Sequence, residues 1–214
     1  MPLFDHTIAE ITRIVKGELL QARDEQCLIN DLLTDSRRLV TPEGCLFFSL
    51  ASKRNDGHKY IEDLYNKGVR NFVVQKSPEN LLLLYDANII LVKDSLVALQ
   101  ALAAAHRRQF NIQVIGITGS NGKTIVKEWL YQLMYEDKSI VRSPKSFNSQ
   151  IGVPLSVWQM NENHELAIFE AGISEPDEME RLQPIILPTI GIFTNLGHAM
   201  MRTSSTATRR PVRS

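Results

Sequence analysis

The stretch GITGSNGKTIVKEW, residues 116–129, decides the fold class of the second half of the chain. It follows the apolar run IQVI and continues without a break into a helical pattern. A strand that ends in glycines and leads into a helix N-terminus points backbone N–H groups at an anion, and the helix dipole favours negative charge there. The stretch therefore predicts a phosphate-binding loop between a buried strand and a helix.

The loop itself reads TGSNGKT, and we expect all of its residues to contribute to the phosphate site: Thr118, Gly119, Ser120, Asn121, Gly122, Lys123 and Thr124. The Lys123 ammonium would lie against the outer phosphates, and the Thr124 hydroxyl would bind Mg²⁺. The spacing is shorter than in the standard P-loop, because Ile117 stands where that motif has its first glycine. The alternative is a tight strand-to-helix turn with a surface lysine.

Composition indicates an ordinary globular protein. Of the 214 residues, 43% are hydrophobic and 22% are charged, with 24 basic and 24 acidic side chains, so bulk charge does not indicate nucleic-acid binding. The final stretch 199–214 holds four arginines and no acid, which leaves 20 basic against 24 acidic residues in 1–198. Two cysteines are too few for a disulfide framework, and no apolar run approaches the length of a membrane span. We therefore expect a cytoplasmic protein.

Hydrophobic periodicity predicts two α/β regions with a boundary near residue 110. In the first region we expect helices over 7–17, 59–68 and 95–110 and strands over 45–50, 69–75 and 88–94. In the second we expect strands over 112–119, 138–143, 165–172 and 189–197 and helices over 123–136 and 176–185. Alternation of strands and helices predicts a parallel sheet with crossover helices.

The compact TGSNGKT loop resembles the ATP loop of the Mur ligases, the ATP-dependent amide ligases of peptidoglycan precursor synthesis. The resemblance extends from about residue 8 to residue 197. Residues 34–74, TDSRRLV through NFVV, are similar to the N-terminal domain that binds the uridine nucleotide in this family. The resemblance implies contacts with the UDP-sugar for Ser36, Arg37, Asp56, Gly57 and His58.

Two further segments are similar to the family's ATPase domain. In SFNSQIGVPLSVW, Asn148 takes the position of a substrate-binding residue, and LAIFEAG ends in a magnesium-binding glutamate, here Glu170. Among family members the pattern is most similar to the ligase that adds D-alanyl-D-alanine to a UDP-N-acetylmuramoyl-tripeptide. The resemblance thus implies an α/β protein, with a small UDP-binding α/β domain followed by an incomplete Rossmann-like P-loop domain.

In this family a substrate carboxylate attacks the γ-phosphate of ATP, and the incoming amine displaces phosphate from the resulting acyl phosphate. The resemblance implies that Lys123 and Glu170 are catalytic, that Thr124 and Glu170 bind Mg²⁺, and that ATP is the nucleotide. Simpler explanations stay open. Glu170 would otherwise be a solvated acid at a strand end, Arg37 a solvated surface charge, His58 an ordinary loop histidine, and Asn148 the cap of the IGVPL turn.

The resemblance breaks after TIGIFTNLG, where the family continues with further metal-site residues. Inserting one nucleotide near Ala199 allows the tail MMRTSST to be written as codons for HDENFIN, which is closer to the family pattern. We therefore predict domains at 1–110 and 111–198, the second truncated, followed by a frameshifted basic tail at 199–214. A genuine basic tail that binds an anionic partner is the alternative.

The sequence therefore predicts an amide ligase by family, with UDP-N-acetylmuramoyl-peptide and D-alanyl-D-alanine as substrates, and no nucleic-acid partner or membrane span. We expect the full-length protein to be a monomer and this chain alone to be inactive. Two other functions stay open, namely a generic P-loop NTPase and a non-catalytic fragment that binds UDP-sugars.

Overall fold

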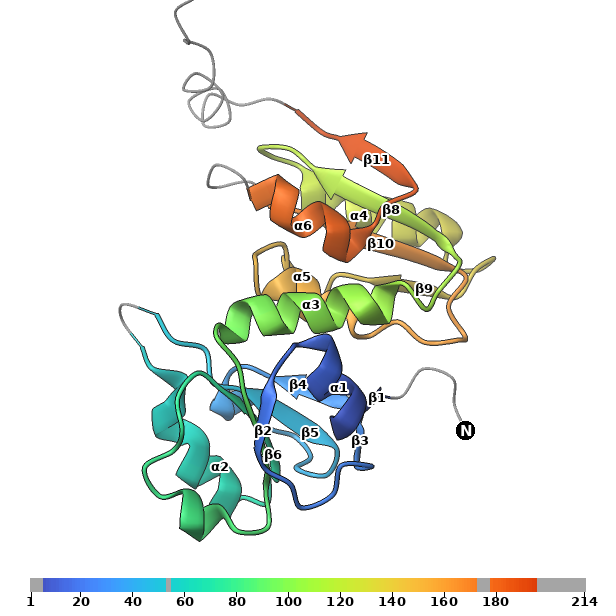
Figure 1. Cartoon of the computed structure of the whole chain (residues 1–214). Coiled ribbons are helices and arrows are strands. Elements are labelled where there is room, and N and C mark those ends of the chain that lie inside the picture. The colour runs from blue at the N-terminus through green and yellow to red at the C-terminus, as the bar shows by residue number, and fades with distance from the viewer. Residues whose placement is uncertain (1–5, 53–54, 173–177, 196–214) are drawn as a thin grey trace, which may run out of the picture. The chain divides into compact units, whose positions relative to one another are not determined.

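The computed structural model describes residues 6–52, 55–172 and 178–195 (Figure 1). The chain divides into two compact units, residues 1–106 and 107–214. The proposed frameshift and the tail 199–214 lie outside the described residues. No helix in the described part of the chain is long and apolar enough to cross a membrane.

The first unit is built on a five-stranded sheet with the order β2-β7-β6-β5-β4, and β1 and β3 pair separately as a two-stranded sheet. All neighbours in the larger sheet are parallel except β2, which runs antiparallel to β7. Its elements are β1 (His6–Thr7), α1 (Ile8–Ile14), β2 (Glu18–Gln21), β3 (Leu28–Ile29), β4 (Asp31–Leu33), η1 (Ser36–Arg38), β5 (Cys45–Phe48), η2 (Gly57–Tyr60), α2 (Ile61–Asn66), β6 (Asn71–Val74), η3 (Leu81–Leu84), β7 (Asn88–Leu91) and α3 (Ser95–Arg107).

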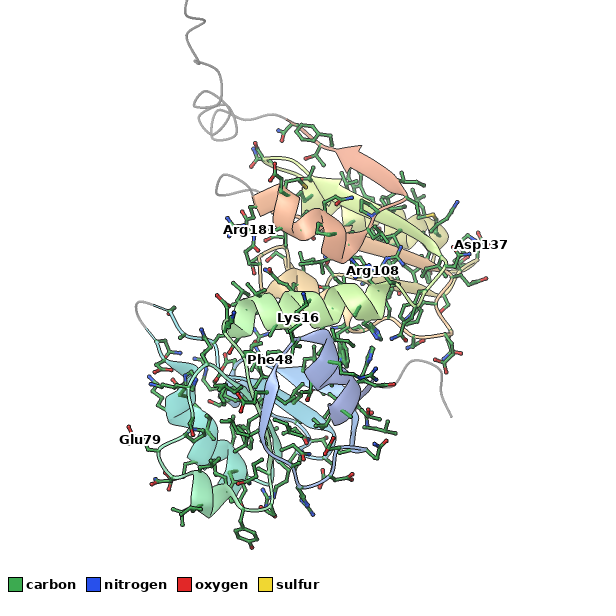
Figure 2. All side chains as sticks on the ribbon, in the orientation of Figure 1. Lys16, Phe48, Glu79, Arg108, Asp137 and Arg181 are labelled. Carbon is green, nitrogen blue, oxygen red and sulfur yellow. The ribbon has the colours of Figure 1, made fainter. Side chains whose placement is uncertain are left out.

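The central strands β5 and β6 are buried along their whole length, which is the pattern of a parallel sheet covered on both faces. Phe47 and Phe72 meet edge to face, with ring centroids 6.4 Å apart. Phe48 is fully buried, whereas Glu79 lies at the exposed edge of the unit (Figure 2). The predicted strands and helices of this region are confirmed, and β1, β2, β3 and β4 were not predicted.

Helix ends in the first unit follow local chemistry. Thr7 and Glu10 form a reciprocal capping box at the start of α1. The helix predicted over 7–17 ends at Ile14, and Lys16 after it takes a positive φ of 52°. Gly17 is instead needed for close packing, since a Cβ there would lie 2.5 Å from a methyl group of Ile90. Gly68 follows Lys67, the C-cap of α2, and has a φ of 100°, as is common for a glycine directly after a helix.

Different side-chain contacts set the start and the end of helix α3. Asp94 caps it, because its carboxylate accepts the backbone N–H groups of Leu96 and Val97. The helix was predicted to reach Phe110 but stops at Arg107. The buried Arg107 guanidinium donates to the carbonyl of Phe110, which fixes the chain in a turn rather than in a further helical turn.

The second unit contains a four-stranded parallel sheet with the order β11-β8-β10-β9. Its elements are β8 (Gln113–Thr118), α4 (Lys123–Met134), β9 (Ile140–Arg142), α5 (Gly152–Val157), β10 (Leu166–Glu170), α6 (Glu178–Ile186) and β11 (Ile190–Phe193). The parallel sheet and its two crossover helices α4 and α6 are confirmed, and the short α5 was not predicted. Helices α4 and α6 lie on opposite faces of the sheet (Figure 1).

The apolar face of α4 covers one face of this sheet. Val126, Leu130 and Met134, spaced at four-residue intervals, pack against a cluster that includes Ile117 and Ile168 of the two central strands. Because β8 and β10 are neighbours and parallel, their carboxyl ends lie side by side. This packing holds the start of α4 next to those strand ends, where ligands bind in open α/β sheets.

Candidate functional site

The predicted phosphate loop lies between the end of β8 at Thr118 and the start of α4 at Lys123. Gly119 has a φ of 133° and Gly122 a φ of 84°, and Gly122 is the N-cap of the helix. A Cβ on Gly119 would lie 2.1 Å from the hydroxyl oxygen of Thr194, so only glycine fits there. The loop therefore needs both the conformational freedom and the small size of these glycines.

Two residues after β11 brace the loop from the side. Asn195 accepts the N–H of Ser120 through its backbone oxygen at 3.0 Å and the N–H of Asn121 through its side-chain oxygen at 2.9 Å. The Thr194 hydroxyl donates to the carbonyls of Thr118 and Asn121. Both amides already donate to Asn195, so they would have to change partners to bind a phosphate. Their contact with phosphate stays a prediction. Sequence reasoning missed this brace, since its residues are remote in the chain.

The Lys123 side chain folds back over the loop. Its ammonium donates to the carbonyl of Gly119 at 2.7 Å and is partly buried. One hydrogen bond leaves the ammonium with further donor capacity, and the first N–H groups of α4 have no partner inside the helix. A cation and a helix N-terminus thus meet at the loop, as the sequence predicted for an anion site.

Glu170 ends β10 directly beside the start of α4. Its Oε2 accepts the Thr124 hydroxyl at 3.1 Å, so the two predicted magnesium ligands lie together. The alternative of a solvated strand-end acid is wrong, because Glu170 is fully buried. Strand register decides this contact, since Glu170 pairs with Ile117 one residue before the loop.

A second lysine approaches the same carboxylate. Lys127 is fully buried, and its ammonium lies 2.9 Å from Oε1 of Glu170. Sequence reasoning missed this residue and treated α4 after the loop as an ordinary amphipathic helix. The signal was present, however, because Lys127 precedes Leu130 by three residues and Met134 by seven and therefore lies on the apolar face of α4.

The chemistry of this cluster fits a magnesium ion. Oε1 of Glu170 is buried, and among the described residues its polar partner is the Lys127 ammonium, 2.9 Å away in an ion pair. Mg²⁺ prefers oxygen ligands and is commonly held by one or two carboxylates together with phosphate oxygens. Glu170 and Thr124 supply a carboxylate and a hydroxyl oxygen beside the loop, so both residues fit the ion.

In the first unit, Ser36 and Arg37 form the short helix η1. Asp35 caps it by accepting the N–H of Arg37 and also binds the Arg37 guanidinium through two hydrogen bonds of 2.9 and 2.7 Å. These contacts with Arg37 lower the pKa of the Asp35 carboxyl to about 2. The Arg37 side chain is 86% exposed, so it is accessible to a ligand, and its contact with a UDP-sugar stays a prediction.

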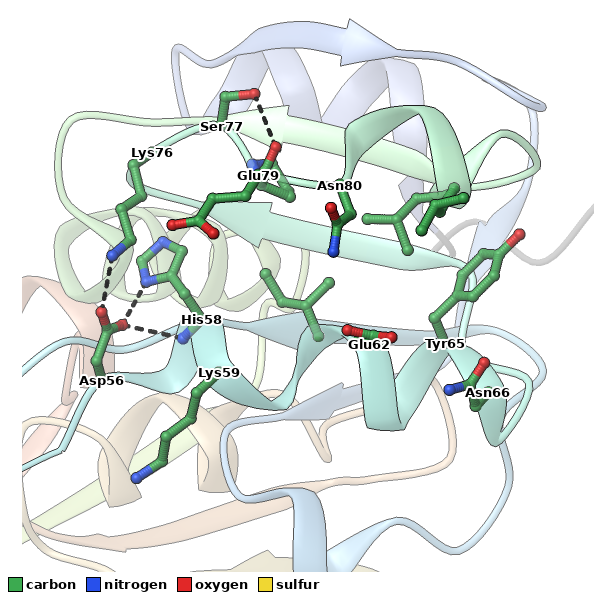
Figure 3. Close-up of a pocket in the computed structure, with 14 residues that line it drawn as sticks. Asp56, His58, Lys59, Glu62, Tyr65, Asn66, Lys76, Ser77, Glu79 and Asn80 are labelled. Carbon is green, nitrogen blue, oxygen red and sulfur yellow. Dashed lines mark hydrogen bonds and ion pairs between the residues drawn. The ribbon is translucent and has the colours of Figure 1, made fainter.

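The three residues of the DGH motif, Asp56, Gly57 and His58, have different structural roles. Asp56 binds Lys76 at 3.0 Å and the Nδ1 atom of His58 at 2.5 Å (Figure 3). The backbone N–H of His58, followed by the His58 ring and Lys76, holds the pKa of Asp56 well below its ordinary value. Gly57 is buried, and a Cβ there would lie 2.8 Å from the backbone nitrogen of Leu50.

His58 and Ser49 resemble part of a catalytic triad but cannot act as one. The backbone N–H of Gln75 donates to Nε2 of His58 at 3.0 Å, so Nδ1 carries the proton and donates to Asp56. The buried Ser49 hydroxyl lies 3.1 Å from the same Nε2 but donates to the carbonyl of Val73 at 2.8 Å. His58 therefore orders the loop, and both of its ring nitrogens are engaged within the protein.

A pocket of about 540 Å³ opens beside this cluster (Figure 3). Asp56, His58 and Lys76 form one side of it, and the rest comes from Lys59, from α2, from residues 77–80 and from η3. Of the five residues predicted to contact the UDP-sugar, Asp56 and His58 line this pocket, whereas Ser36, Arg37 and Gly57 do not. The structure therefore does not gather all five around one cavity.

Asn148 does not cap the IGVPL turn, which corrects one of the two explanations for it. The N–H of Gly152 instead donates to the Ser149 hydroxyl at 3.1 Å. The backbone carbonyl of Asn148 accepts the N–H of Gly172 at 2.7 Å, which holds its loop against the segment after Glu170. The other explanation, contact with substrate, stays a prediction.

Comparisons with known proteins agree with this geometry. Residues 117–206 match the family model of the Mur ligase middle domain. Over 204 residues the chain is 35% identical to the UDP-N-acetylmuramoyl-tripeptide–D-alanyl-D-alanine ligase of Bacillus subtilis (strain 168), covering 94% of this chain and 43% of that relative. The chain thus spans less than half the length of the curated relatives that it matches.

Solved structures with a similar fold are also MurF ligases. MurF from Acinetobacter baumannii superposes with a TM-score of 0.83 at 26% identity, over 94% of this chain and 43% of that one. MurF ligase from Thermotoga maritima, solved in complex with ADP, gives a TM-score of 0.70 at 28% identity, over 80% of this chain and 39% of that one. By sequence, fold and the arrangement of its phosphate loop, this chain belongs to the Mur ligase family.

Proposed function

We propose that this chain carries the UDP-binding part and the phosphate loop of an ATP-dependent ligase that joins D-alanyl-D-alanine to UDP-N-acetylmuramoyl-tripeptide. The single observation that supports this most directly is the contact of 3.1 Å between Thr124, at the start of the phosphate-loop helix, and the buried Glu170. The names of the similar ligases supply the two substrates. The proposal places the reaction in the cytoplasm, where ATP and soluble UDP-linked precursors are available.

The proposed reaction proceeds in two transfers. A carboxylate oxygen of the UDP-linked tripeptide attacks the γ-phosphorus of ATP, and the bond from that phosphorus to the oxygen bridging to ADP breaks. The amine of D-alanyl-D-alanine then attacks the carbonyl carbon of the acyl phosphate, loses a proton and expels inorganic phosphate. Such phosphoryl transfer needs little covalent chemistry from the protein, which mainly positions groups and neutralises charge.

The residues of the second unit suit these tasks. Lys123, held over the loop by Gly119, would neutralise charge on the transferring phosphoryl group. Thr124 and Glu170 would hold Mg²⁺, which when bound neutralises charge on the phosphate oxygens. The N-terminus of α4 would orient the phosphates through its N–H groups. In the first unit, Ser36, Arg37 and Asp56 are the proposed contacts to the UDP-sugar.

The test is nucleotide binding by the chain and its Lys123→Ala variant, measured by calorimetry with ADP or a non-hydrolysable ATP analogue. We expect a loss of roughly 10- to 100-fold, because a hydrogen bond to a charged group is worth about 1.5–3 kcal/mol. Lys138→Ala, which removes an exposed lysine after the same helix, is the matched control. Unchanged affinity in Lys123→Ala would contradict the phosphate-loop assignment.

Two further measurements separate the rival functions and the assembly state. Calorimetry with the UDP-linked precursor should give heat with wild type and less heat with Arg37→Ala. A generic P-loop NTPase would hydrolyse ATP without that precursor, and a UDP-sugar-binding fragment would bind the precursor but not ATP.

The full-length protein is proposed to be a monomer, and a dimer mass in light scattering would contradict this.

A further inference from the structure

Lys127 lies near the phosphate loop in a position that the proposed reaction does not explain. It lies one turn after Lys123 on α4, and its side chain is fully buried. Lysines are rarely buried unless they are paired, because removing an ammonium group from water is costly. Apolar residues of similar volume often replace a buried ion pair without loss of stability, so stability alone is a poor reason for Lys127.

The partners of Lys127 come from two other segments. The carboxylate of Glu170, at the end of β10, lies 2.9 Å from the ammonium, and that of Glu128 on α4 lies 3.2 Å away. The ammonium also donates to the carbonyls of Ser143, at 2.8 Å, and of Lys145. Lys127 therefore joins the phosphate-loop helix to the end of β10 and to the loop after β9.

The loop after β9, residues 143–149, depends on these contacts. Lys145 has a φ of 50°, a conformation that side chains other than glycine adopt at a cost, and its carbonyl points to Lys127. The Ser143 hydroxyl accepts the N–H of Glu170 at 3.1 Å. Farther along, the carbonyl of Asn148 accepts the N–H of Gly172. The loop and the strand end that carries Glu170 are thus connected at several points.

The Glu170 carboxylate is consequently held from both sides. Its Oε2 accepts the Thr124 hydroxyl, whereas its Oε1 is paired with the Lys127 ammonium. Without the ammonium, the Oε1 side of the carboxylate would lose its ion-pair partner among the described residues. Partners of this kind, which orient a metal-binding side chain, commonly change metal affinity when they are removed.

We propose that Lys127 is a positioning residue that orients Glu170 for the magnesium ion and ties the loop 143–149 to it. This inference rests on the proposed function of the phosphate loop. Two opposing effects of Lys127 on magnesium binding can be told apart, because an ammonium that orients Glu170 also repels a nearby divalent cation. If orientation dominates, removing Lys127 weakens the magnesium-dependent part of nucleotide binding; if repulsion dominates, removing it strengthens that part.

The experiment measures the affinity of the 214-residue chain for ADP in excess Mg²⁺ and in EDTA. The ratio of the two dissociation constants is the magnesium increment. We expect Lys127→Met to reduce this increment about 10-fold or more, as is usual for the removal of such a partner. Binding in EDTA should change by less than about threefold, because the phosphate contacts of the loop and of Lys123 do not involve Lys127.

Three variants serve as references. Glu170→Gln should abolish the increment, and Lys127→Met combined with Glu170→Gln should show no loss beyond that of Glu170→Gln alone. Lys138→Met removes the same charge from an exposed site and should leave the increment unchanged. An unchanged or larger increment in folded Lys127→Met would overturn the inference, and so would an equal loss in Mg²⁺ and in EDTA, which indicates general damage.

If Lys127→Met does not fold, Lys127→Gln is tested by the same criteria, because its amide can still donate to a carbonyl of the loop. Hydrogen exchange of the Gly172 amide tests the connection to the loop, and faster exchange is expected once Lys127 is replaced. Unchanged exchange would overturn that part of the inference.

The outcomes for the two hypotheses are distinct. A wild-type chain that binds no ADP would overturn the proposed function itself. A wild-type chain that shows the magnesium increment, together with a Lys127→Met variant that shows the same increment, would overturn only the role of Lys127.

Discussion

The two regions that carry the predicted binding residues hold their charges in opposite ways. In the second unit, Lys127 and Glu170 are both fully buried and contact each other within one cluster. In the first unit, Arg37 and Asp35 pair at the surface, with the Arg37 side chain 86% exposed. Water screens the exposed pair and leaves it free to exchange partners, whereas the buried pair is held in one geometry. Similar charges therefore suit a fixed metal site in one region and an adaptable ligand surface in the other.

The largest expected effect tests how rigid the buried region is. Gly119→Ala would place a Cβ 2.1 Å from the Thr194 hydroxyl at a φ of 133°. Backbone strain and overpacking each cost about 1–3 kcal/mol, so nucleotide affinity should fall roughly 100-fold or more. Calorimetry with ADP measures this. In the control Gly191→Ala, on the neighbouring β11, a Cβ meets nothing within 4 Å and binding should be unaffected; normal binding by Gly119→Ala would show that the loop is not held as described.

A second effect compares the stabilities of the two ion pairs directly. Glu170→Ala leaves the Lys127 ammonium buried without its nearest carboxylate. Loss of one partner from a buried pair typically costs about 3–5 kcal/mol, which urea unfolding of the chain should detect. Arg37→Ala breaks the exposed pair with Asp35 and should not shift the unfolding midpoint. Equal shifts for the two variants would mean that burial does not separate the regions.

The smallest expected effect is the pH dependence of the stability of the first unit, through Asp56. The pKa of Asp56 lies below its ordinary value of 3.8, because the His58 backbone N–H, the His58 ring and Lys76 all bind the ionised carboxylate. A lowered folded-state pKa adds stability above pH 3.8 that disappears as the pH falls through the folded value. Asp56 is 45% exposed, so we expect less than about 1 kcal/mol.

Asp56→Asn should therefore be less stable than wild type at pH 7, and the difference should shrink as the pH is lowered to 2. Urea unfolding followed at several pH values measures this. Glu43→Gln, which removes an exposed acid from the same unit, is the control. A difference that is independent of pH would indicate that Asp56 acts only as the neutral cap of η2.

Local patterns predicted most of the fold. In the second unit the strands follow from short apolar runs and helices α4 and α6 from helical periodicity, whereas α5 was not predicted. The glycine-rich loop follows from its place between a strand and a helix. The missed strands β1, β2, β3 and β4 are two to four residues long, and β2 runs antiparallel at the edge of the first sheet. Pairing of this kind depends on residues that are distant in the chain, such as Glu18 with Leu91, and leaves no local pattern.

The candidate site was predicted in the same uneven way. Lys123, Thr124 and Glu170 came from motifs, and the structure brings Thr124 and Glu170 together. His58 was predicted to contact the UDP-sugar, and in the structure Gln75 and Asp56 engage both nitrogens of its ring. The same tertiary contacts that build a site also decide which of its polar atoms remain available.

The sequence by itself determined that a glycine-rich turn joins a buried strand to a helix and that a lysine and a threonine begin that helix. These features depend on backbone freedom and on neighbours within a few residues. Only the tertiary structure decided that Glu170 and Lys127 form a buried pair and that Asn195 braces the loop. The reason is physical, because burial and hydrogen bonding between remote segments exist only once the sheet has assembled and removed those groups from water.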